Sequence, residues 1–166
     1  MKDYILGIDP GITGAIAVYG PEADYVLGVW DMPTCERLYG KGLQVDPVGL
    51  YRLIYQDIQV SPEHYRIAIE NVGPMPKQGV TSSFNFGHSI GILQGVLAGT
   101  GIDVEYIHPV TWKKMFGLVG SGKDECRQMV IEAYFDQAHN LRLKKHQGRA
   151  DAIAIAVAAD RISRGQ

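Results

Sequence analysis

The sequence predicts a single α/β domain built on a five-stranded mixed sheet with helices on both faces. Three short β-rich segments come first, and strand-like and helical segments alternate after them. The chain has 166 residues and is 46% hydrophobic, which is enough apolar material for one core. A Gly/Pro turn joins the first two strands, which makes them antiparallel, whereas strands joined through a helix are parallel. The first strand is therefore expected at the centre of a mixed sheet.

The first half of the chain contains four strands and one helix in this prediction. DPGITG separates two apolar runs and is typical of a hairpin with a longer loop. Asp46-Pro47 favours a helix start, because proline is tolerated in the first turn of a helix. The segment 35–45 is rich in turn residues and mixed in charge, so it is interpreted as a loop. The expected elements are strands at 4–8, 15–19 and 25–30, the loop at 35–45, the helix from Asp46, and a strand at 66–70.

The second half is predominantly helical. NVGPMPKQG holds two prolines and two glycines, which exclude regular structure there. Thr81-Ser-Ser is expected to cap a long helix that carries Gly87, Gly91 and Gly95 on one stripe, and such small residues allow close packing. The expected elements are helices at 81–97, 109–115, 123–135 and 149–161, with a fifth strand at 103–107.

Charge is distributed unevenly along the chain. The net charge is only -2, but residues 1–70 hold five Lys/Arg against ten Asp/Glu, and residues 111–150 hold eight against four. Such asymmetry indicates an acidic site beside a basic surface, and hence a polyanionic partner. A solvated charged face is the alternative for the basic segment.

The composition also bears on the class of protein. The sequence has no apolar run of membrane-spanning length and no N-terminal secretion signal. Cys35 and Cys126 lie far apart and form no CxxC motif, which is typical of reduced thiols. We therefore expect a cytoplasmic protein without a membrane partner.

Three carboxylates are expected to meet at one edge of the sheet. Asp9 ends the first strand and Glu70 ends the fourth, so parallel neighbours would place them side by side. Asp151 lies in the first turn of the last helix and reaches them if that helix crosses the edge. Adjacent carboxylates repel one another and raise their pKa values. Divalent cations with oxygen ligands resolve this conflict, and two such ions form a standard site for phosphodiester cleavage.

Each acid also has a purely structural interpretation. Asp9 could cap the glycine turn that follows it. Glu70 could pair with Arg66 or Lys77. Asp151 could stabilise the dipole of its helix. The joint pattern of two strand-end acids and one helix-start acid favours the metal site.

Six segments of the chain resemble a known family. They occur in the order found in RuvC-type Holliday junction resolvases, and they are most similar to the branch carried by phages and prophages: GIDPGITGAIAV, IAIENV, FNFGHSIGILQGVL, HPVTWKKMFGL, GSGKDECRQM and GRADAIAIA. The resemblance covers nearly the whole chain. It implies a ribonuclease H-like fold and a homodimer acting on four-way DNA junctions. It also implies paired symmetric nicks, dependent on Mg²⁺ or Mn²⁺, that leave 5′-phosphate and 3′-hydroxyl ends.

The same resemblance assigns the catalytic positions. Asp9, Glu70 and Asp151 match three of the family's four metal-binding residues, which hold two ions per active site. The fourth is usually an acid or histidine three to five residues before the final aspartate, where this chain reads HQG. His146 is therefore the candidate for the fourth catalytic and metal-binding role. A solvated loop histidine is the alternative.

Further residues are candidates for DNA contacts. Lysines 113, 114 and 123 match basic positions of the family, and the segment after Glu70 is expected at the DNA face. Phe84 could wedge between bases, although a core position on its helix is equally compatible with the sequence. The full set of DNA-binding candidates is Lys77, Gln78, Phe84, Lys113, Lys114, Lys123, Lys144, Lys145 and Arg149. The glycine-marked helix is the expected dimer interface.

Three other functions remain open at the level of sequence. GIDPGITG could be the phosphate loop of an ATP-dependent kinase or actin-like domain, but those proteins need two such lobes, so no nucleotide cofactor is expected. A binding module could recognise branched DNA without cutting it. A nuclease could prefer forks or flaps to four-way junctions.

Overall fold

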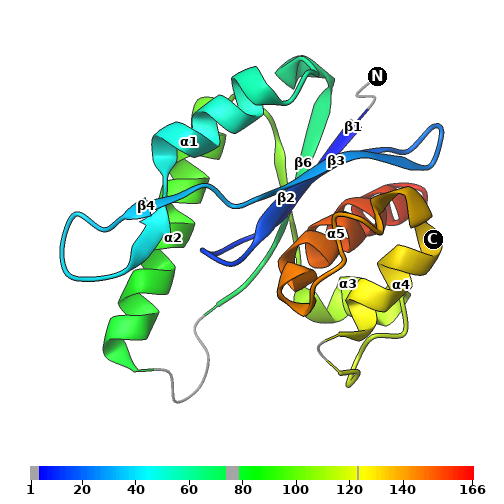
Figure 1. Cartoon of the computed structure of the whole chain (residues 1–166). Helices are drawn as coiled ribbons and strands as arrows, with labels where there is room; N and C mark the ends of the chain where they lie inside the picture. Colours follow the sequence, from blue (N-terminus) through cyan, green and yellow to red (C-terminus); the bar gives the residue numbers. More distant parts are fainter. Residues whose placement is uncertain (1–3, 74–78, 123) are drawn as a thin grey trace.

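The computed structural model describes residues 4–73, 79–122 and 124–166, and it has the predicted five-stranded sheet (Figure 1). The strand order is β3-β2-β1-β6-β7, with β1 at the centre. β1 pairs antiparallel with β2 and parallel with β6, and β6 pairs parallel with β7. The strands are β1 (Tyr4–Asp9), β2 (Ala15–Gly20), β3 (Tyr25–Asp31), β6 (Tyr65–Glu70) and β7 (Val104–Ile107). The mixed sheet with a central first strand is thus confirmed.

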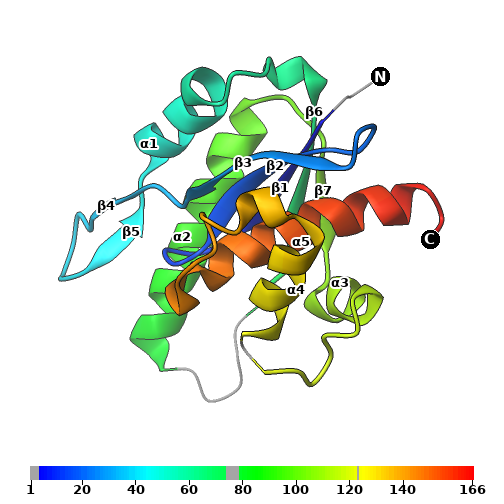
Figure 2. The ribbon, with the colours of Figure 1, turned by 45° about the vertical axis from the view of Figure 1, so that its right-hand side comes forward.

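Helices cover both faces of this sheet, as predicted (Figures 1 and 2). α1 (Pro47–Arg52) and α2 (Val80–Gly99) pack on one face. α3 (Pro109–Met115), α4 (Glu125–Ala133) and α5 (Gln147–Ser163) pack on the other. α5 approaches β1 closely, because a Cβ at Gly7 would collide with the backbone of Ala152. The alanines of α5 keep that helix narrow enough to lie directly on the central strand.

Two helix starts follow the local sequence and one does not. The Asp46 side chain accepts a hydrogen bond from the Val48 N–H at 3.0 Å, which caps α1 as Asp-Pro predicts. His108 Nδ1 accepts one from the Val110 N–H at 3.2 Å and caps α3. The predicted Thr/Ser cap of the long helix is wrong, because α2 begins at Val80 with Gly79 as its N-cap. These hydroxyl residues lie inside the first turn instead.

The segment predicted as a loop at 35–45 is a two-stranded hairpin. β4 (Thr34–Glu36) pairs antiparallel with β5 (Leu43–Val45), and the hairpin projects away from the main sheet (Figure 1). Positive φ angles of 81° at Gly40 and 108° at Gly42 turn the chain at its tip. Arg37 stabilises this turn through a hydrogen bond from Nε to the Leu43 carbonyl at 2.9 Å. Each strand has only three residues, which is too short for a hydrophobic alternation to be recognised in the sequence.

Two features of composition have structural counterparts. Cys35 and Cys126 are both free thiols. Among the described residues, none of the helices combines the length and hydropathy needed to cross a membrane.

Candidate active site

Asp9 and Glu70 lie side by side at one edge of the sheet. Each is the last residue of its strand, and the parallel register pairs Ile8 with Ile69 directly before them. The carboxyl ends of β1 and β6 therefore deliver both side chains to the same place, as the sequence predicts. Burial is the main cause that raises the pKa of Asp9 well above its usual value, and the negative charges of Asp151 and Glu70 raise it further.

Trp112 holds the Glu70 carboxylate. This tryptophan is fully buried in α3, and its Nε1–H donates to Glu70 Oε1 at 2.9 Å. The neutral donor fixes one carboxylate oxygen without neutralising the charge. Sequence reasoning missed this contact, because 42 residues separate the two partners.

Asp151 approaches the same edge from α5. Burial raises the pKa of Asp151 to about 6; a hydrogen bond with the Cys126 thiol opposes that shift, and the charge of Glu70 adds to it. Within the described part of the chain, Asp151 Oδ1 is the one buried side-chain oxygen that has no hydrogen-bond partner. A buried carboxylate oxygen without a donor is costly unless something else binds it.

Lys113 is the cation whose charge acts on both Asp9 and Asp151. It lowers the pKa of both Asp9 and Asp151, and its Nζ lies 5.2 Å from the centre of the Trp112 ring. A cavity of about 180 Å³ opens between α3 and the start of α5, lined by Lys113, Asp151 and Gln147 among others. Lys113 thus borders a space that adjoins the acids.

Gly148 allows α5 to approach Asp9. A Cβ at this position would lie 2.5 Å from the Thr13 carbonyl oxygen and 3.0 Å from Asp9 Oδ2. The residue three before Asp151 therefore touches the site as bare backbone. The sequence contains the signal in HQGRAD, but only the packing shows that no side chain fits there.

The donor set fits a hard divalent cation. All three acids present carboxylate oxygens, which are the ligands that Mg²⁺ and Mn²⁺ prefer. Asp151 Oδ1 accepts no hydrogen bond, so a bound cation would compensate its buried negative charge. Among the residues that the structure describes, no three His, Cys, Asp or Glu side chains form a compact metal-binding group. Two metal ions per site therefore stay a prediction from the donors.

His146 lies in a short 3₁₀ turn (Lys144–His146) immediately before α5. Burial and the charge of Arg149 lower its pKa. Its Nδ1 is 3.4 Å from the backbone nitrogen of Leu143 and accepts a hydrogen bond from that N–H. This bond favours the neutral tautomer that carries the proton on Nε2. That proton must leave Nε2 before Nε2 can bind a metal. The charges that act most on His146 include Arg149, Asp31 and Lys145, and the fourth catalytic role stays a prediction.

Arg149 binds protein groups. Its Nε and Nη2 donate to the two carboxylate oxygens of Asp31 at 2.6 and 2.7 Å, and its Nη1 donates to the Asn140 carbonyl at 2.9 Å. This arrangement ties the start of α5 to the end of β3. A DNA contact by Arg149 stays a prediction, and it competes with this bidentate pair.

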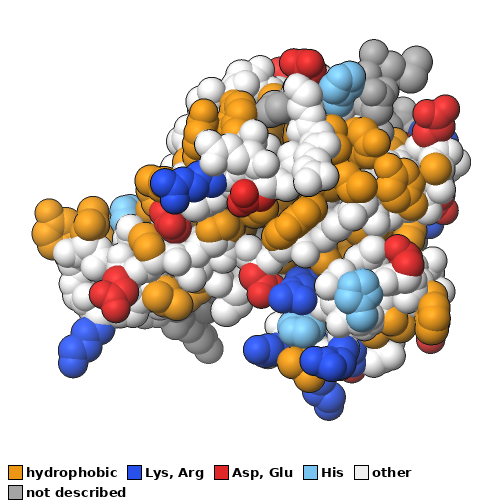
Figure 3. All heavy atoms as spheres, turned by 45° about the horizontal axis from the view of Figure 1, so that its top comes forward, with side chains coloured by type: hydrophobic (Ala, Val, Ile, Leu, Met, Phe, Trp, Pro, Cys, Tyr) orange, Lys and Arg blue, Asp and Glu red, His pale blue; other side chains and the backbone are white. Residues whose placement is uncertain are grey.

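Three of the lysines predicted to contact DNA are exposed. Lys114 is exposed on α3, and Lys144 and Lys145 are exposed just before α5. Figure 3 shows Lys, Arg and His side chains gathered beside a hollow in the surface. We call these three residues and Lys113 the lysine surface.

Phe84 is exposed on α2. Its side chain is 70% accessible and stacks on His88 at 6.1 Å between ring centres, so a core position for Phe84 is wrong. Lys77, Gln78 and Lys123, the other predicted DNA contacts, lie outside the described residues.

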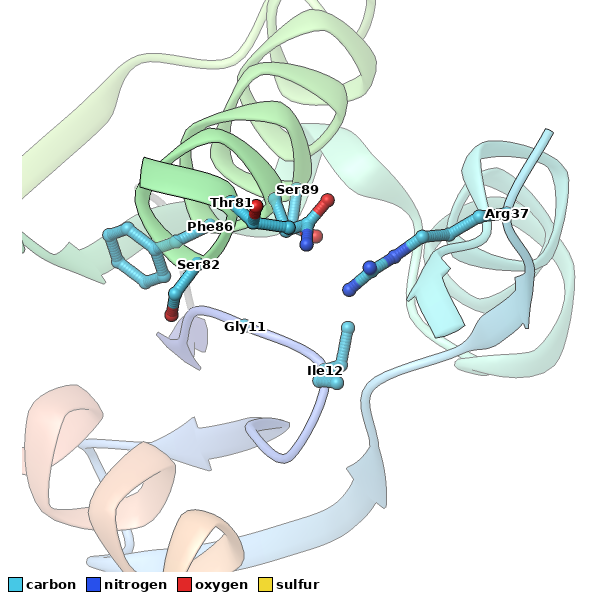
Figure 4. Close-up of a pocket in the computed structure, with 8 residues that line it drawn as sticks. Gly11, Ile12, Arg37, Thr81, Ser82, Phe86 and Ser89 are labelled. Atoms are coloured by element: carbon cyan, nitrogen blue, oxygen red, sulfur yellow. The ribbon is translucent and has the colours of Figure 1, made fainter. Parts of the chain in front are cut away.

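A second, larger cavity of about 470 Å³ lies on the other side of the loop after Asp9. Figure 4 shows Gly11 and Ile12 on one side of it, the first turns of α2 on another, and Arg37 reaching in from the hairpin. None of these residues is among the site residues predicted from the sequence. Arg37 lies in the segment interpreted as a loop.

No protein-family model and no curated protein matches this chain, whereas solved structures do. One is Thermus thermophilus RuvC in complex with a Holliday junction substrate, with a TM-score of 0.58 and 15% identity. Another is Thermus thermophilus RuvC, with a TM-score of 0.55 and 19% identity. Each match covers 98% of this chain and 96% of the other. The chain therefore has the fold of RuvC, a ribonuclease H-like fold, over almost its full length.

Proposed function

We propose that this chain is a metal-dependent, structure-specific DNA endonuclease that resolves four-way junctions by paired nicks. The observation that carries the proposal is the meeting of Asp9, Glu70 and Asp151 from three separate elements of a RuvC-like fold. Each acid raises the energy of another, and such an arrangement is found where a cation is bound. A stable fold gains nothing from that repulsion.

The three acids are the proposed ligands of Mg²⁺ or Mn²⁺, two ions per site. When bound, these ions stabilise charge on the phosphate and lower the pKa of water. Trp112 orients Glu70 through its Nε1–H, and the glycine backbone at 148 leaves room for Asp9. Lys113 is placed to stabilise negative charge that develops at a phosphate near the acids. His146 is the candidate for the fourth ligand.

The substrate contacts follow from the surface around the acids. The lysine surface binds phosphates in this proposal, and Phe84 inserts between bases at the junction centre. Lys77, Gln78 and Lys123 belong to the same proposed interface. Cleavage takes place in the cytoplasm, that of the host if a phage encodes the chain, and serves DNA recombination and repair with 5′-phosphate and 3′-hydroxyl products.

A homodimer is part of the proposal. Two symmetric cuts need two active sites, and a two-fold axis matches the symmetry of a four-way junction. The α2 glycines support α2 as the interface: a Cβ at Gly87, Gly91 or Gly95 would meet no atom within 4 Å. Leu93 and Leu97 are buried and lie on the opposite side of the same helix.

The test is cleavage of a mobile four-way junction compared with fork, flap and linear duplex, with and without Mg²⁺. Asp9→Asn, Glu70→Gln and Asp151→Asn should each abolish cutting while junction binding is kept or improved, because each change removes negative charge near phosphates. Asp57→Asn, at the exposed end of the segment after α1, is the matched control and should cut normally.

The outcomes separate the alternatives. Faster cleavage of forks or flaps than of junctions would replace the junction with those substrates. Tight junction binding without cutting in Mg²⁺ or Mn²⁺ would favour a non-cleaving binding module. Near-normal cutting by one of the three acid variants would remove that residue from the metal site.

A further inference from the structure

The 470 Å³ cavity beside the acid site has no role in the function proposed above. Three separated parts of the chain form it: the loop after β1, the start of α2 and the β4–β5 hairpin. Its volume is in the range of pockets that hold small organic groups. The position, the charge and the lining together indicate what it binds.

The cavity begins close to Asp9. Gly11 and Ile12 form one wall, and Gly11 is two residues from Asp9, a separation of at most about 7 Å along the chain. Gly11 has a φ of 110°, which turns the loop away from the strand. If a phosphate of a DNA strand lay at the acids, an adjacent nucleotide would be within reach of this cavity.

Arg37 supplies the charge. Its Nε donates to the Leu43 carbonyl at 2.9 Å and its Nη1 to the Lys41 carbonyl at 3.3 Å, which holds the guanidinium in place on the hairpin. The side chain points from the hairpin across the cavity toward Ile12 and α2 (Figure 4). A positioned guanidinium at the wall of a pocket is suited to a phosphate oxygen.

The other end of the cavity is aromatic. Phe86 lines it from α2, and Figure 4 shows the Phe86 ring on the opposite side from Arg37. Ile12 adds an apolar side chain close to the Arg37 guanidinium, and Thr81 and Asn85 add polar groups. A cation at one end and an aromatic ring at the other match the phosphate and the base of a nucleotide.

The hairpin extends this surface away from the body of the protein. Between β4 and β5 its tip carries Arg37 and Lys41, with Glu36 as the one acid of the segment 34–45. Leu38 is 80% and Tyr39 is 90% exposed. The net positive charge of this segment contrasts with the acidic balance of the first 70 residues.

We propose that this cavity binds one nucleotide of the cleaved DNA strand next to the cut phosphate, with Arg37 on its phosphate and Phe86 against its base. The hairpin tip lies along the same DNA arm. This inference deepens the proposed function and rests on it. DNA is a better occupant than a second copy of the chain, because the wall of the cavity starts two residues after Asp9 and carries a cation.

The test is a phosphate-neutralisation scan. Four-way junctions are prepared with one methylphosphonate at each position near the branch point, and binding is measured by fluorescence anisotropy without a divalent cation. For the wild type, one position next to the cut should weaken binding by about tenfold, the cost of one charged hydrogen bond. In Arg37→Ala the same position should have no further effect, while Arg37→Lys should keep part of it. Arg52→Ala, an exposed arginine on α1, is the matched control and should keep the wild-type profile.

A second pair of measurements tests the cavity without changing the hairpin, because Arg37→Ala removes hydrogen bonds that hold the hairpin turn. Phe86→Leu is combined with an abasic nucleotide at the position found in the scan. The wild type should lose affinity when the base is removed, and Phe86→Leu should not. Equal profiles for wild type and Arg37→Ala, together with equal abasic effects for wild type and Phe86→Leu, overturn the inference. A change of oligomeric state in Arg37→Ala with an unchanged scan would assign the hairpin to a subunit contact instead.

The binding scan is independent of cleavage. An Arg37-dependent phosphate contact in a protein that never cuts the junction would support the cavity and reject the nuclease. Normal cutting with no Arg37-dependent position would support the nuclease and reject the cavity.

Discussion

Asp151 is a residue whose buried charge opposes the stability of the fold. Burial raises its pKa to about 6 from an ordinary value of 3.8, and the pKa of Asp9 shifts in the same direction. A proton therefore binds the folded state more tightly than the unfolded state. In the metal-free protein, these two carboxyl groups should therefore favour folding most below about pH 4. Their contribution to the free energy of unfolding should be lost as the pH rises through about 6.

Asp151→Asn should remove part of this loss of folding stability at high pH. At pH 7 the variant should gain up to about 3 kcal/mol in the free energy of unfolding, and several degrees in Tm, because an amide carries no charge to bury. Thermal unfolding from pH 4 to 8 in EDTA measures this gain in stability, with Asp57→Asn as the control. Saturating Mg²⁺ should stabilise the wild type and not the variant. An unchanged Tm and an unchanged pH slope for Asp151→Asn would contradict the assignment of a strained, cation-binding carboxyl.

His146 is the candidate for the fourth catalytic position. If it completes the site, His146→Ala should lower the cleavage rate at least tenfold across pH 6 to 9 in saturating Mg²⁺, with junction binding retained. The matched control is His139→Ala, an exposed histidine with no part in the proposed site. A rate within about twofold of wild type at every pH would leave three acids as the whole site.

The meeting of the three acids was predictable from the sequence, and the contacts that support them were not. Strand-end positions and the parallel register bring Asp9 and Glu70 together, and both can be inferred from local pattern and chain order. The Trp112 hydrogen bond and the close approach of Gly148 depend on how distant segments pack. No periodicity encodes such contacts.

At the scale of elements, the glycine stripe of α2 is exposed where the sequence suggested close packing. The Cβ positions of Gly87, Gly91 and Gly95 face open space, and no other part of the described chain lies within 4 Å of them. The buried residues Ser89, Leu93 and Leu97 lie on the other stripe. The packing partner predicted for the glycines is, in our proposal, a second copy of α2.

Gly91→Arg should therefore convert a dimer into a monomer. Arginine has a higher helix propensity than glycine, so the substitution should not unfold α2, but its charge and size would block a close helix contact. Sedimentation at micromolar concentration measures the mass against 18.2 kDa for one chain. Val48→Arg, at an exposed position on α1, is the control and should stay dimeric. A single 18.2 kDa species for the wild type, with and without junction DNA, would end the dimer proposal.

The elements also show where local pattern is insufficient. Five main strands and the major helices follow from hydrophobic periodicity, because each buries an apolar face. The hairpin from Thr34 to Val45 buries few apolar residues, and its turn depends on Gly40 and Gly42 at positive φ. Its exposed Leu38 and Tyr39 would mislead any assignment based on burial.

At the scale of the whole molecule, the basic segment contains fewer available cations than its composition suggests. Arg127 pairs with Asp124 at 2.7 Å, and Arg149 pairs with Asp31. The lysine surface therefore carries most of the DNA affinity in our proposal, joined by Lys123. A protein with a net charge of -2 has to engage DNA through such a local patch.

Junction binding should consequently weaken steeply with salt. Four or five phosphate contacts by lysine give a slope of about -4 in a plot of log affinity against log salt concentration, at roughly -0.9 per phosphate. The double variant Lys144→Ala/Lys145→Ala should reduce the magnitude of this slope by about 2, because it removes two exposed charges without changing the acids.

Arg149→Ala should act differently. It breaks the bidentate pair with Asp31, so it should lower Tm and leave the salt slope nearly unchanged. Anisotropy titrations between 50 and 300 mM KCl measure all three proteins. A flat salt response in the wild type would mean that the lysine surface faces solvent in the complex, and a slope change for Arg149→Ala equal to that of a lysine would return Arg149 to the DNA interface.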